Sequence, residues 1–296
     1  MAYGMPYMGS KSKIAKDIIK CLPSAEYFVD LFGGGGAMTC CAIESGKYKT
    51  VVYNEKEKLV YDGFNMAING DFITEKRWIS REDFDKLKSI DPYVAICYSF
   101  GNSLTNYLYS ALIEPWKEAL HYARIFKDYS KLRQFGIYGD GGKIDIANNF
   151  TSYKQKYCNW MSDNINADKQ HFGELEHIER LNRLEHIERL NRKNIEIKTY
   201  NLSYEQLQLP NNSIIYCDPP YKDTKKYLSN FDHDKFYTWL RNNENLIFIS
   251  EYNMPNDFYE IANFSRIDTY KTNSKRVTEK LFCNKPYKIV QSIKLF

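Results

Sequence analysis

The sequence lacks the patterns that mark secreted, zinc-binding and membrane-spanning proteins. Its cysteines form no Cys-x-x-Cys pair, have no zinc-type spacing with histidine, and are odd in number: Cys21, Cys40, Cys41, Cys97, Cys158, Cys217 and Cys283. We therefore expect reduced thiols and no metal site. No apolar run approaches the length of a membrane span, and the amino-terminal residues contain no signal-peptide core. These absences predict a cytoplasmic protein without a membrane partner.

A strong excess of either charge is also absent. The 296 residues include 41 Lys and Arg and 37 Asp and Glu, a formal net charge of +4. The total therefore indicates no particular partner, and only the distribution of charge along the chain can do so. The length suits one large domain, or a core that carries an inserted subdomain.

Predicted strands occur near both ends of the chain. Strand 27–31, a glycine-rich turn, helix 39–45 and strand 50–54 form a βαβ unit, which implies a parallel sheet. The other predicted elements are helix 11–22, strands 196–201, 214–217, 246–251, 280–282 and 288–294, and helix 234–242. We expect an α/β fold whose sheet is built from residues 1–74 and 173–296.

The intervening segment, residues 75–172, has a different composition. Between residues 121 and 160, seven Lys and Arg stand among nine aromatic residues and three Asp and Glu. One interpretation is a solvated helical insert with a small aromatic core. The other is a nucleic-acid surface, on which cations contact phosphates and aromatic rings stack on bases. Composition alone does not decide between them.

A tandem repeat follows this insert. Leu175–Arg183 and Leu184–Arg192 are the same nine residues. Two copies are too few to stack as a solenoid, so we predict a short helical linker. His177 and His186 occupy the same position in the two copies, among charged residues, and we expect neither to bind a metal.

A chemically informative turn follows the predicted strand 214–217. Pro219 and Pro220 cannot continue a strand, so the backbone must turn there. The turn holds the Asp218 carboxylate, unpaired backbone carbonyls and the ring of Tyr221 at the sheet edge where α/β proteins bind ligands. These oxygens are acceptors, so they suit an exocyclic amino group on a flat molecule. A simple Pro-Pro turn is the alternative.

A glycine run and an acidic residue mark the first βαβ unit. Residues 33–36 are four consecutive glycines, which let the backbone turn sharply and approach a ligand closely. The run lacks the Gly-x-Gly-x-x-Gly register and no Gly-Lys-Ser/Thr follows it, which disfavours a dinucleotide or a nucleoside triphosphate. Glu55 follows the next strand, where a carboxylate can accept both hydroxyls of a ribose. A surface glutamate at a strand end is the alternative.

These motifs in this order resemble the N6-adenine DNA methyltransferases, in particular the Dam-like D12 class, whose cofactor motif comes first. The residues that carry the resemblance are Asp30-Leu-Phe-Gly-Gly-Gly-Gly, Glu55 and Asp218-Pro-Pro-Tyr221. Tyr7-Met-Gly-Ser-Lys11 is similar to the first cofactor-contacting motif of the family, and Lys280-Leu-Phe to its last strands. The resemblance spans the chain and is loosest over 75–172.

The resemblance implies a Rossmann-like methyltransferase core, 1–74 plus 173–296, with a mainly helical target-recognition domain inserted at 75–172. It also implies S-adenosyl-L-methionine as cofactor. The reaction would transfer a methyl group to N6 of an adenine flipped out of a specific double-stranded DNA sequence, with a GATC-like site as the first candidate. We expect the enzyme to act on DNA as a monomer, and a cognate restriction endonuclease is a possible partner if it belongs to a restriction–modification pair.

Roles for individual residues follow from the same resemblance. Cofactor contacts are implied for Tyr7, Lys11, Asp30, Phe32, Gly33, Gly34, Gly35, Gly36, Glu55, Asn201, Ser203 and Asp218. Within this set, Lys11 would contact the cofactor's carboxylate and Glu55 its ribose. In catalysis, the Asp218 side chain and the Pro219 carbonyl would accept the two hydrogens of N6, beside the rigid Pro220. Tyr221 would stack on the base, and transfer would be direct, without a metal.

DNA contacts are expected directly after the Asp-Pro-Pro-Tyr motif, in a loop near the carboxyl terminus, and in the insert. Phosphates would be contacted by Lys222, Lys225, Lys226, Lys275 and Arg276. Base edges would be read by residues of the insert, for which the candidates are Asn102, Asn106, Arg124, Arg133 and Gln134.

Two other interpretations stay open. One is a related amino-methylating enzyme, above all an N4-cytosine DNA methyltransferase, although such groups tend to carry Ser or Asn in place of Asp218. The other is a DNA-binding protein that keeps the fold without catalysis. The sequence also leaves open whether the enzyme stands alone, belongs to a phage, or is half of a restriction–modification pair.

Overall fold

The computed structural model describes most of the chain. The described residues are 3–135, 175–191, 193–221, 231–270 and 273–288, with the side chains of 266–277 left outside. They form two compact units, which are residues 1–70 with 183–296, and residues 71–182. The second unit spans the whole of the segment 75–172 in which the sequence predicts an insert.

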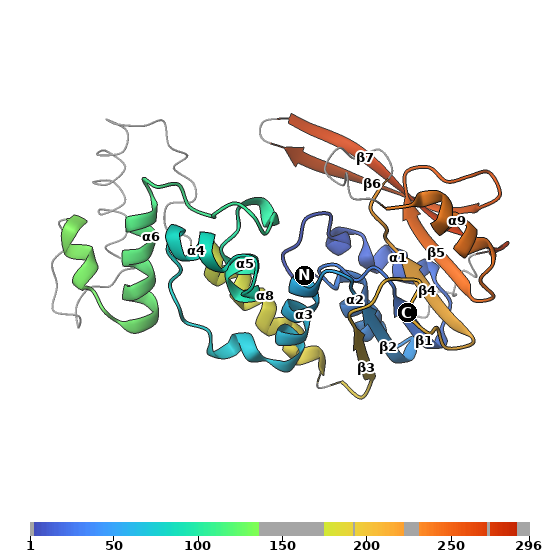
Figure 1. The fold of residues 1–296 in the computed structure, drawn as a ribbon, viewed down its shortest axis with the longest axis horizontal. Coiled ribbons are helices and arrows are strands. Elements are labelled where there is room, and N and C mark those ends of the chain that lie inside the picture. Colours follow the sequence, from blue (N-terminus) through green and yellow to red (C-terminus); the bar gives the residue numbers. More distant parts are fainter. Residues whose placement is uncertain (1–2, 136–174, 192, 222–230, 271–272, 289–296) are drawn as a thin grey trace, which may run out of the picture. The chain divides into compact units, whose positions relative to one another are not determined.

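The first unit contains a seven-stranded sheet in the order β3-β2-β1-β4-β5-β7-β6 (Figure 1). Its strands are β1 (Ala25–Asp30), β2 (Tyr48–Asn54), β3 (Glu196–Tyr200), β4 (Ser213–Cys217), β5 (Leu246–Glu251), β6 (Tyr259–Tyr270) and β7 (Asn273–Cys283). The strands from β3 to β5 run parallel, whereas β7 is antiparallel to both of its neighbours. This mixed sheet, with strands from both ends of the chain, confirms the predicted α/β class with a Rossmann-like core.

Helical segments connect these strands. Those of the first unit are η1 (Lys11–Lys13), α1 (Ala15–Cys21), α2 (Ala37–Ser45), α3 (Lys58–Asn69) and α9 (His233–Arg241). The predicted helix 11–22 is therefore interrupted. A 3-10 turn forms first, because the Ser10 hydroxyl accepts from the backbone N–H of Ser12 and the Ile14 N–H donates to the Lys11 carbonyl. Lys11 is buried in this turn.

Two predictions about the carboxyl-terminal strands need correction. The predicted strand 280–282 is the end of a longer strand, β7, and its partner β6 was not predicted. β7 pairs with β5 over four residues, and β6 and β7 pair with each other at the edge of the sheet. A strand at an edge does not need a continuous apolar run, and β6 has none in its sequence. In the predicted strand 288–294, Lys288 is not in a strand and residues 289–294 lie outside the described part of the chain.

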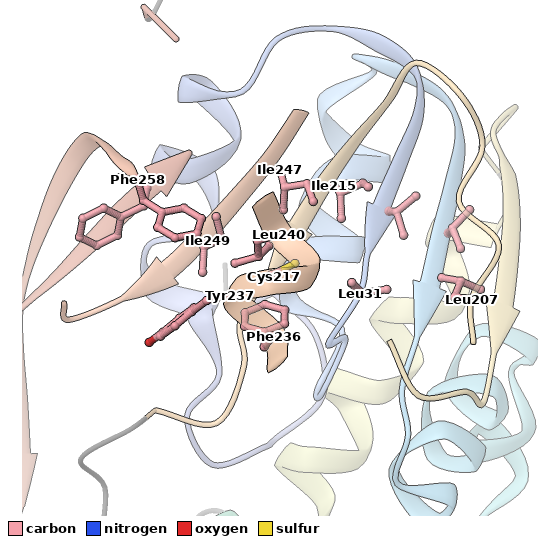
Figure 2. Packing of buried hydrophobic residues seen from close by; sticks show 13 residues of the cluster. Leu31, Leu207, Ile215, Cys217, Phe236, Tyr237, Leu240, Ile247, Ile249 and Phe258 are labelled. Atoms are coloured by element: carbon pink, nitrogen blue, oxygen red, sulfur yellow. The ribbon is translucent and has the colours of Figure 1, made fainter. Parts of the chain in front are cut away.

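The core against one face of the sheet is packed from helix α9 and from the strands that it covers. Phe236 and Leu240 of α9 lie against Ile215 of β4 and Ile249 of β5, and all four side chains are fully buried (Figure 2). β4 is buried along its whole length, as expected for a parallel strand covered on both faces. This packing fixes the carboxyl end of β4, where Asp218 follows.

The second unit is mainly helical. Its elements are η2 (Asp71–Thr74), α4 (Arg81–Leu87), α5 (Pro92–Cys97), η3 (Phe100–Asn102), α6 (Glu114–His121), η4 (Tyr122–Phe126) and η5 (Ser130–Phe135).

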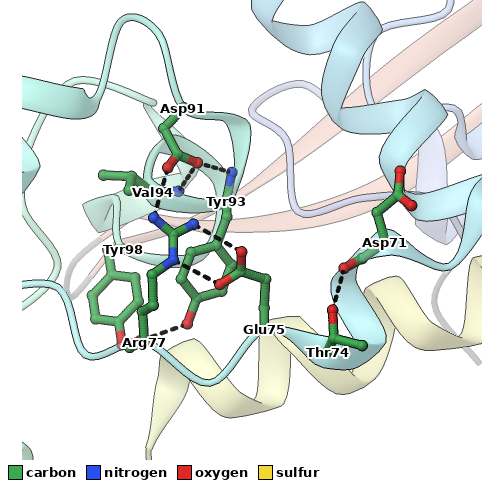
Figure 3. Close-up of polar contacts among 8 residues, drawn as sticks. All are labelled: Asp71, Thr74, Glu75, Arg77, Asp91, Tyr93, Val94 and Tyr98. Atoms are coloured by element: carbon green, nitrogen blue, oxygen red, sulfur yellow. Dashed lines mark hydrogen bonds and ion pairs between the residues drawn. The ribbon is translucent and has the colours of Figure 1, made fainter.

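A network of polar side chains around Arg77 fixes the backbone between η2 and α5. The Arg77 guanidinium donates to Glu75 at 2.8 and 2.9 Å and to Asp91 at 3.0 Å, and the Tyr93 and Tyr98 hydroxyls donate to the Arg77 carbonyl (Figure 3). Asp91 also caps α5.

The tandem repeat forms one helix, α8 (Glu176–Asn191), which confirms the predicted helical linker. The helix passes from the second unit into the first at Arg183. The two copies differ in environment, because His177 is fully buried, whereas His186 is partly exposed and lies 3.7 Å from Glu44. The fold therefore buries His177 although its neighbours in the sequence are charged. Apolar residues at every third position move gradually around the helix, because an α-helix has about 3.6 residues per turn. The apolar residues of the two copies therefore face different directions, and each copy can bury its own within its own unit.

Candidate active site

A pocket of about 760 Å³ opens at the carboxyl ends of the parallel strands of the first unit, within the range that holds small ligands. Its wall includes most of the residues for which the sequence predicts cofactor or catalytic roles. These are Tyr7, Lys11, Asp30, Phe32, Gly33, Gly34, Gly35, Glu55, Ser203, Asp218, Pro219, Pro220 and Tyr221. Of the predicted set, Gly36 and Asn201 are outside the lining.

The glycine turn lies directly against buried aromatic rings. A Cβ atom on Gly33 would stand 2.2 Å from Cε2 of Tyr53, and one on Gly36 would stand 2.2 Å from Cε2 of Phe64. Tyr53 stacks on Phe64 with ring centroids 3.9 Å apart, and its hydroxyl donates to the Gly34 carbonyl at 2.8 Å. Gly36 also has a φ of 71° at the start of α2. Side chains are therefore excluded here, and bare backbone faces the pocket.

Glu55 connects this turn to the end of β2. One carboxylate oxygen accepts from the Gly34 N–H and the other from the Glu57 N–H, both at 2.8 Å. Burial raises the pKa of Glu55, although these two backbone N–H groups counteract part of the rise. Each oxygen keeps a second lone pair, so the carboxylate can accept two further hydrogen bonds from a ligand.

Asp30 lies beneath the turn at the end of β1. Its Oδ2 accepts from the Thr39 N–H at 3.0 Å and from the Thr39 hydroxyl at 2.7 Å, which ties β1 to α2. Burial raises the pKa of Asp30 to about 7, against the lowering effect of both Thr39 hydrogen bonds. The side chain therefore supports the floor of the pocket.

Beyond β3, the two predicted cofactor-contacting residues Asn201 and Ser203 have different positions, since only Ser203 lines the pocket. The Asn201 amide donates to the carbonyls of Glu55 and Lys56 at 2.7 and 2.9 Å, so it joins the ends of β2 and β3. Ser203 lines the pocket instead. Near it, the Phe32 ring lies 5.7 Å from Tyr204 and 5.8 Å from Phe231, and all three rings belong to the wall.

Asp218 follows β4 at the predicted Pro-Pro turn. Its Oδ2 lies 2.5 Å from the ammonium of Lys11, and its side chain is 20% exposed. Burial raises the pKa of Asp218, the Lys11 ammonium lowers it, and Glu279 raises it, with a rise as the net result. The remaining oxygen, Oδ1, is the acceptor that Lys11 does not use.

Lys11 contacts two protein carboxylates, whereas the sequence predicts it at the cofactor's carboxylate. Its ammonium lies 2.5 Å from Asp218 and 3.1 Å from Oε1 of Glu279, and its side chain is 5% exposed. A buried ammonium is stable only beside such anions. Burial lowers the pKa of Lys11, but the two carboxylates outweigh this effect and raise it overall.

Tyr221 is held by its hydroxyl, which donates to Oε1 of Glu279 at 2.6 Å. Burial raises the pKa of this hydroxyl, as do the charges of Asp218 and Glu279. The ring meets Tyr252 edge to face, with centroids 4.8 Å apart. Glu279 and Tyr252 were not predicted. Tyr252 could have been found, because it follows β5 at the same edge of the sheet as Asp218, but nothing local marks Glu279.

The predicted DNA-contacting residues are only partly described. Arg124, Arg133 and Gln134 are exposed in the second unit. Asn102 and Asn106 lie in one loop, which is closed by a bridge between Ser99 and Tyr107. Outside the described part of the chain are Lys222, Lys225 and Lys226, and the side chains of Lys275 and Arg276.

The described residues contain neither a metal-binding cluster nor a membrane-spanning helix. Within the described ranges, no three His, Cys, Asp or Glu side chains are grouped so that they could hold a metal ion. Among the helices described, none is both long and apolar enough to cross a membrane.

Comparison with known proteins relates this chain to one family. A family model described as D12 class N6 adenine-specific DNA methyltransferase matches residues 7–251. Among solved structures, the chain aligns with HI0767 from Haemophilus influenzae, a proposed methylase, at 11% sequence identity and a TM-score of 0.32. That alignment covers 95% of this chain and 91% of the other. No curated protein matches the sequence.

Proposed function

The chain belongs to the D12 class of N6 adenine-specific DNA methyltransferases, and we propose that its pocket binds S-adenosyl-L-methionine beside a flipped-out adenine. The family consists of enzymes that methylate adenine in DNA. One observation carries the proposal: a single pocket is lined by the glycine turn, by Glu55 and by Asp218-Pro-Pro-Tyr221. A site for a nucleoside and acceptors for an amino group therefore share one cavity.

The residues present fit this cofactor. The glycine turn presents bare backbone to the pocket, because a Cβ on Gly33 would stand 2.2 Å from the buried Tyr53 ring. Glu55 is oriented by two backbone N–H groups and keeps lone pairs for the two ribose hydroxyls. Phe32, Tyr204 and Phe231 supply an aromatic wall for a purine. When bound, S-adenosyl-L-methionine would supply a methyl group that its sulfonium already activates.

Asp218 and Pro219 would orient the target nitrogen. The adenine N6 lone pair is delocalised into the ring, which makes the nitrogen a poor nucleophile. Its two hydrogens need two acceptors, and the Asp218 carboxylate and the Pro219 carbonyl supply them at a turn fixed by Pro220. Hydrogen bonds to both draw the nitrogen toward tetrahedral geometry and localise its lone pair, so the protein contributes orientation and electrostatics.

Tyr221 and Tyr252 would hold the base itself. Both rings line the pocket, and the hydroxyl bond from Tyr221 to Glu279 restricts rotation of the Tyr221 ring. An adenine inside a duplex cannot reach this pocket, so it must leave the base stack. Residues 75–172 would select the sequence around it, with a GATC-like site as the first candidate, and one copy of the chain would act at one site.

Methyl transfer to DNA provides the test. Purified protein is incubated with S-adenosyl-L-methionine labelled in its methyl group and with unmethylated double-stranded DNA, and the digested nucleosides are separated. We expect label in N6-methyladenine only. Label in N4-methylcytosine would replace the proposal with the cytosine alternative, and DNA binding without label would support a non-catalytic protein. Sequencing of the methylated DNA would identify the site.

A further inference from the structure

Glu279 lies behind the active site and outside the region that the family model matches. Its side chain is fully buried on β7, and it does not line the pocket. Instead it contacts two residues that do. Its Oε1 accepts from the Tyr221 hydroxyl at 2.6 Å and lies 3.1 Å from the Lys11 ammonium. A buried carboxylate in this position acts on the site through these two side chains.

The three ionic groups of this cluster are two carboxylates and a single ammonium. One ammonium, that of Lys11, stands between two carboxylates, those of Asp218 at 2.5 Å and Glu279 at 3.1 Å. The Gly9 carbonyl lies 3.4 Å from the same nitrogen, and the Tyr221 ring centroid lies 5.0 Å away. Lys11 is therefore shared, and Asp218 holds it more closely than Glu279 does.

Lys11 weakens Asp218 as an acceptor while the two stay paired. Under the proposed function, on which this inference rests, the N6 amino group must donate to Asp218, where Lys11 occupies Oδ2 and leaves Oδ1 to the substrate. An ammonium displaced into a buried site without an anion is strongly disfavoured. Without a second anion, Lys11 would stay paired with Asp218 and draw on the charge that makes it a good acceptor.

We propose that Glu279 is a positioning residue that takes over the Lys11 ammonium when the amino group of the target base binds Asp218. The nitrogen is already within ion-pair distance of Glu279, so a small rotation of the Lys11 side chain completes the exchange. The ammonium keeps one carboxylate partner throughout. Asp218 then accepts from the amino group without a paired ammonium, and the total charge of the site does not change.

The substitution Glu279→Gln tests this exchange, because it keeps the volume and the acceptor oxygen and removes the charge. The measurement is methyl transfer in a single turnover, with labelled S-adenosyl-L-methionine and DNA both saturating. We expect the rate to fall roughly ten- to a hundredfold, the effect of losing one hydrogen-bonded charge. Cofactor affinity, measured by calorimetry, should stay within about twofold because Glu279 does not line its pocket.

A matched control separates this effect from general loss of charge. Glu260→Gln, on the neighbouring strand β6, removes an exposed carboxylate that pairs with Lys280 at 2.8 Å. Its transfer rate should equal that of the wild type. If Glu279→Gln keeps the full rate, the exchange does not occur. Should Glu279→Gln fail to bind the cofactor, Glu279→Asp replaces it, since the shorter side chain cannot reach both partners. The rate should again fall, and an unchanged rate overturns the proposal.

Double substitutions identify the residue through which Glu279 acts. In a Lys11→Met background no ammonium has to be transferred, so Glu279→Gln should have little further effect. In a Tyr221→Phe background its effect should remain. A loss that persists without Lys11, or that disappears without the Tyr221 hydroxyl, assigns Glu279 to ring orientation and overturns the exchange. If Lys11→Met is itself inactive because Asp218 loses the charge that lowers its pKa, the Tyr221→Phe background decides alone, and a Glu279→Gln effect that disappears there overturns the exchange.

Failure of the proposed function would look different. It would appear as absence of methyl transfer by the wild type, or as full activity of Asp218→Ala. Wild-type activity that depends on Asp218 but not on Glu279 would leave the proposed function intact and reject the inference alone.

Discussion

The Tyr109 hydroxyl lies 2.7 Å from Nδ1 of His177, at one end of a buried hydrogen-bonded chain in the second unit. Nε2 of His177 lies 2.8 Å from Nδ1 of His121, whose Nε2 lies 2.9 Å from the Lys76 carbonyl. A carbonyl only accepts, so Nε2 of His121 carries a hydrogen, and neutral His121 accepts from Nε2–H of His177. Tyr109 must then donate to His177. Each of the four groups in this hydrogen-bonded series has a partner when both imidazoles are neutral.

Acidification should therefore destabilise the second unit. Burial lowers the pKa of His177 well below its usual value, and His121, Lys117 and Arg180 lower it further. Burial also lowers the pKa of His121, against the raising effect of the Lys76 carbonyl. The unfolded chain then binds protons that the folded chain excludes, so stability should fall as pH drops below about 6.5, the ordinary histidine pKa. Hydrogen exchange followed peptide by peptide between pH 7.5 and 5.5 measures this, and equal protection of residues 71–135 at both pH values would contradict it.

The two copies of the repeat provide a matched pair of substitutions that measures how much these buried hydrogen bonds contribute to stability. His177→Ala leaves Tyr109 and His121 without their shared partner and opens a cavity, so we expect a loss of about 2–4 kcal/mol in unfolding free energy. His186→Ala changes the same position of the second copy, which is 29% exposed, and should cost less than about 0.5 kcal/mol. Urea denaturation of both variants provides the comparison. Equal losses would show that the buried chain contributes no stability of its own.

Local patterns account for the parts of the fold that were predictable. β4 and β5 are buried parallel strands, so each appears in the sequence as a continuous apolar run. The glycine run and the Pro-Pro turn then mark the carboxyl ends of β1 and β4. Parallel strands end at one edge, so Glu55 after β2 and Asp218 after β4 stand at the same edge, and both line one pocket.

Residues whose roles depend on distant partners were not predictable. Glu279 stands between Thr278 and Lys280, a polar context that gives no sign of burial, and only the fold brings Lys11 to it. His177 likewise follows a glutamate in a charged repeat, yet it is enclosed by aromatic side chains of the second unit. In both cases tertiary packing determines the environment of a side chain whose neighbours in sequence are solvated.

The glycine turn should not tolerate a side chain at its first position. In Gly33→Ala the new Cβ would stand 2.2 Å from the Tyr53 ring, which is fully buried and stacked on Phe64 and so cannot yield easily. We expect affinity for S-adenosyl-L-methionine to fall at least about tenfold by calorimetry. Gly46→Ala is the control, with φ at 66° and no atom within 4 Å of a Cβ. It should lower stability by about 1–2 kcal/mol without changing affinity. Equal affinities would exclude the turn from the cofactor site.

Asp218→Ala should separate cofactor binding from chemistry. The substitution removes an acceptor for the N6 amino group, so we expect the single-turnover rate to fall at least about a thousandfold. Lys11 keeps Glu279 as a partner 3.1 Å away, so the pocket should stay folded and the cofactor should bind weakly but measurably. Asp257→Ala, which removes an exposed carboxylate paired with Arg241, should leave the rate unchanged. If Asp218→Ala turns over normally, N6 is oriented by other groups, and the Pro-Pro turn has no part in methyl transfer.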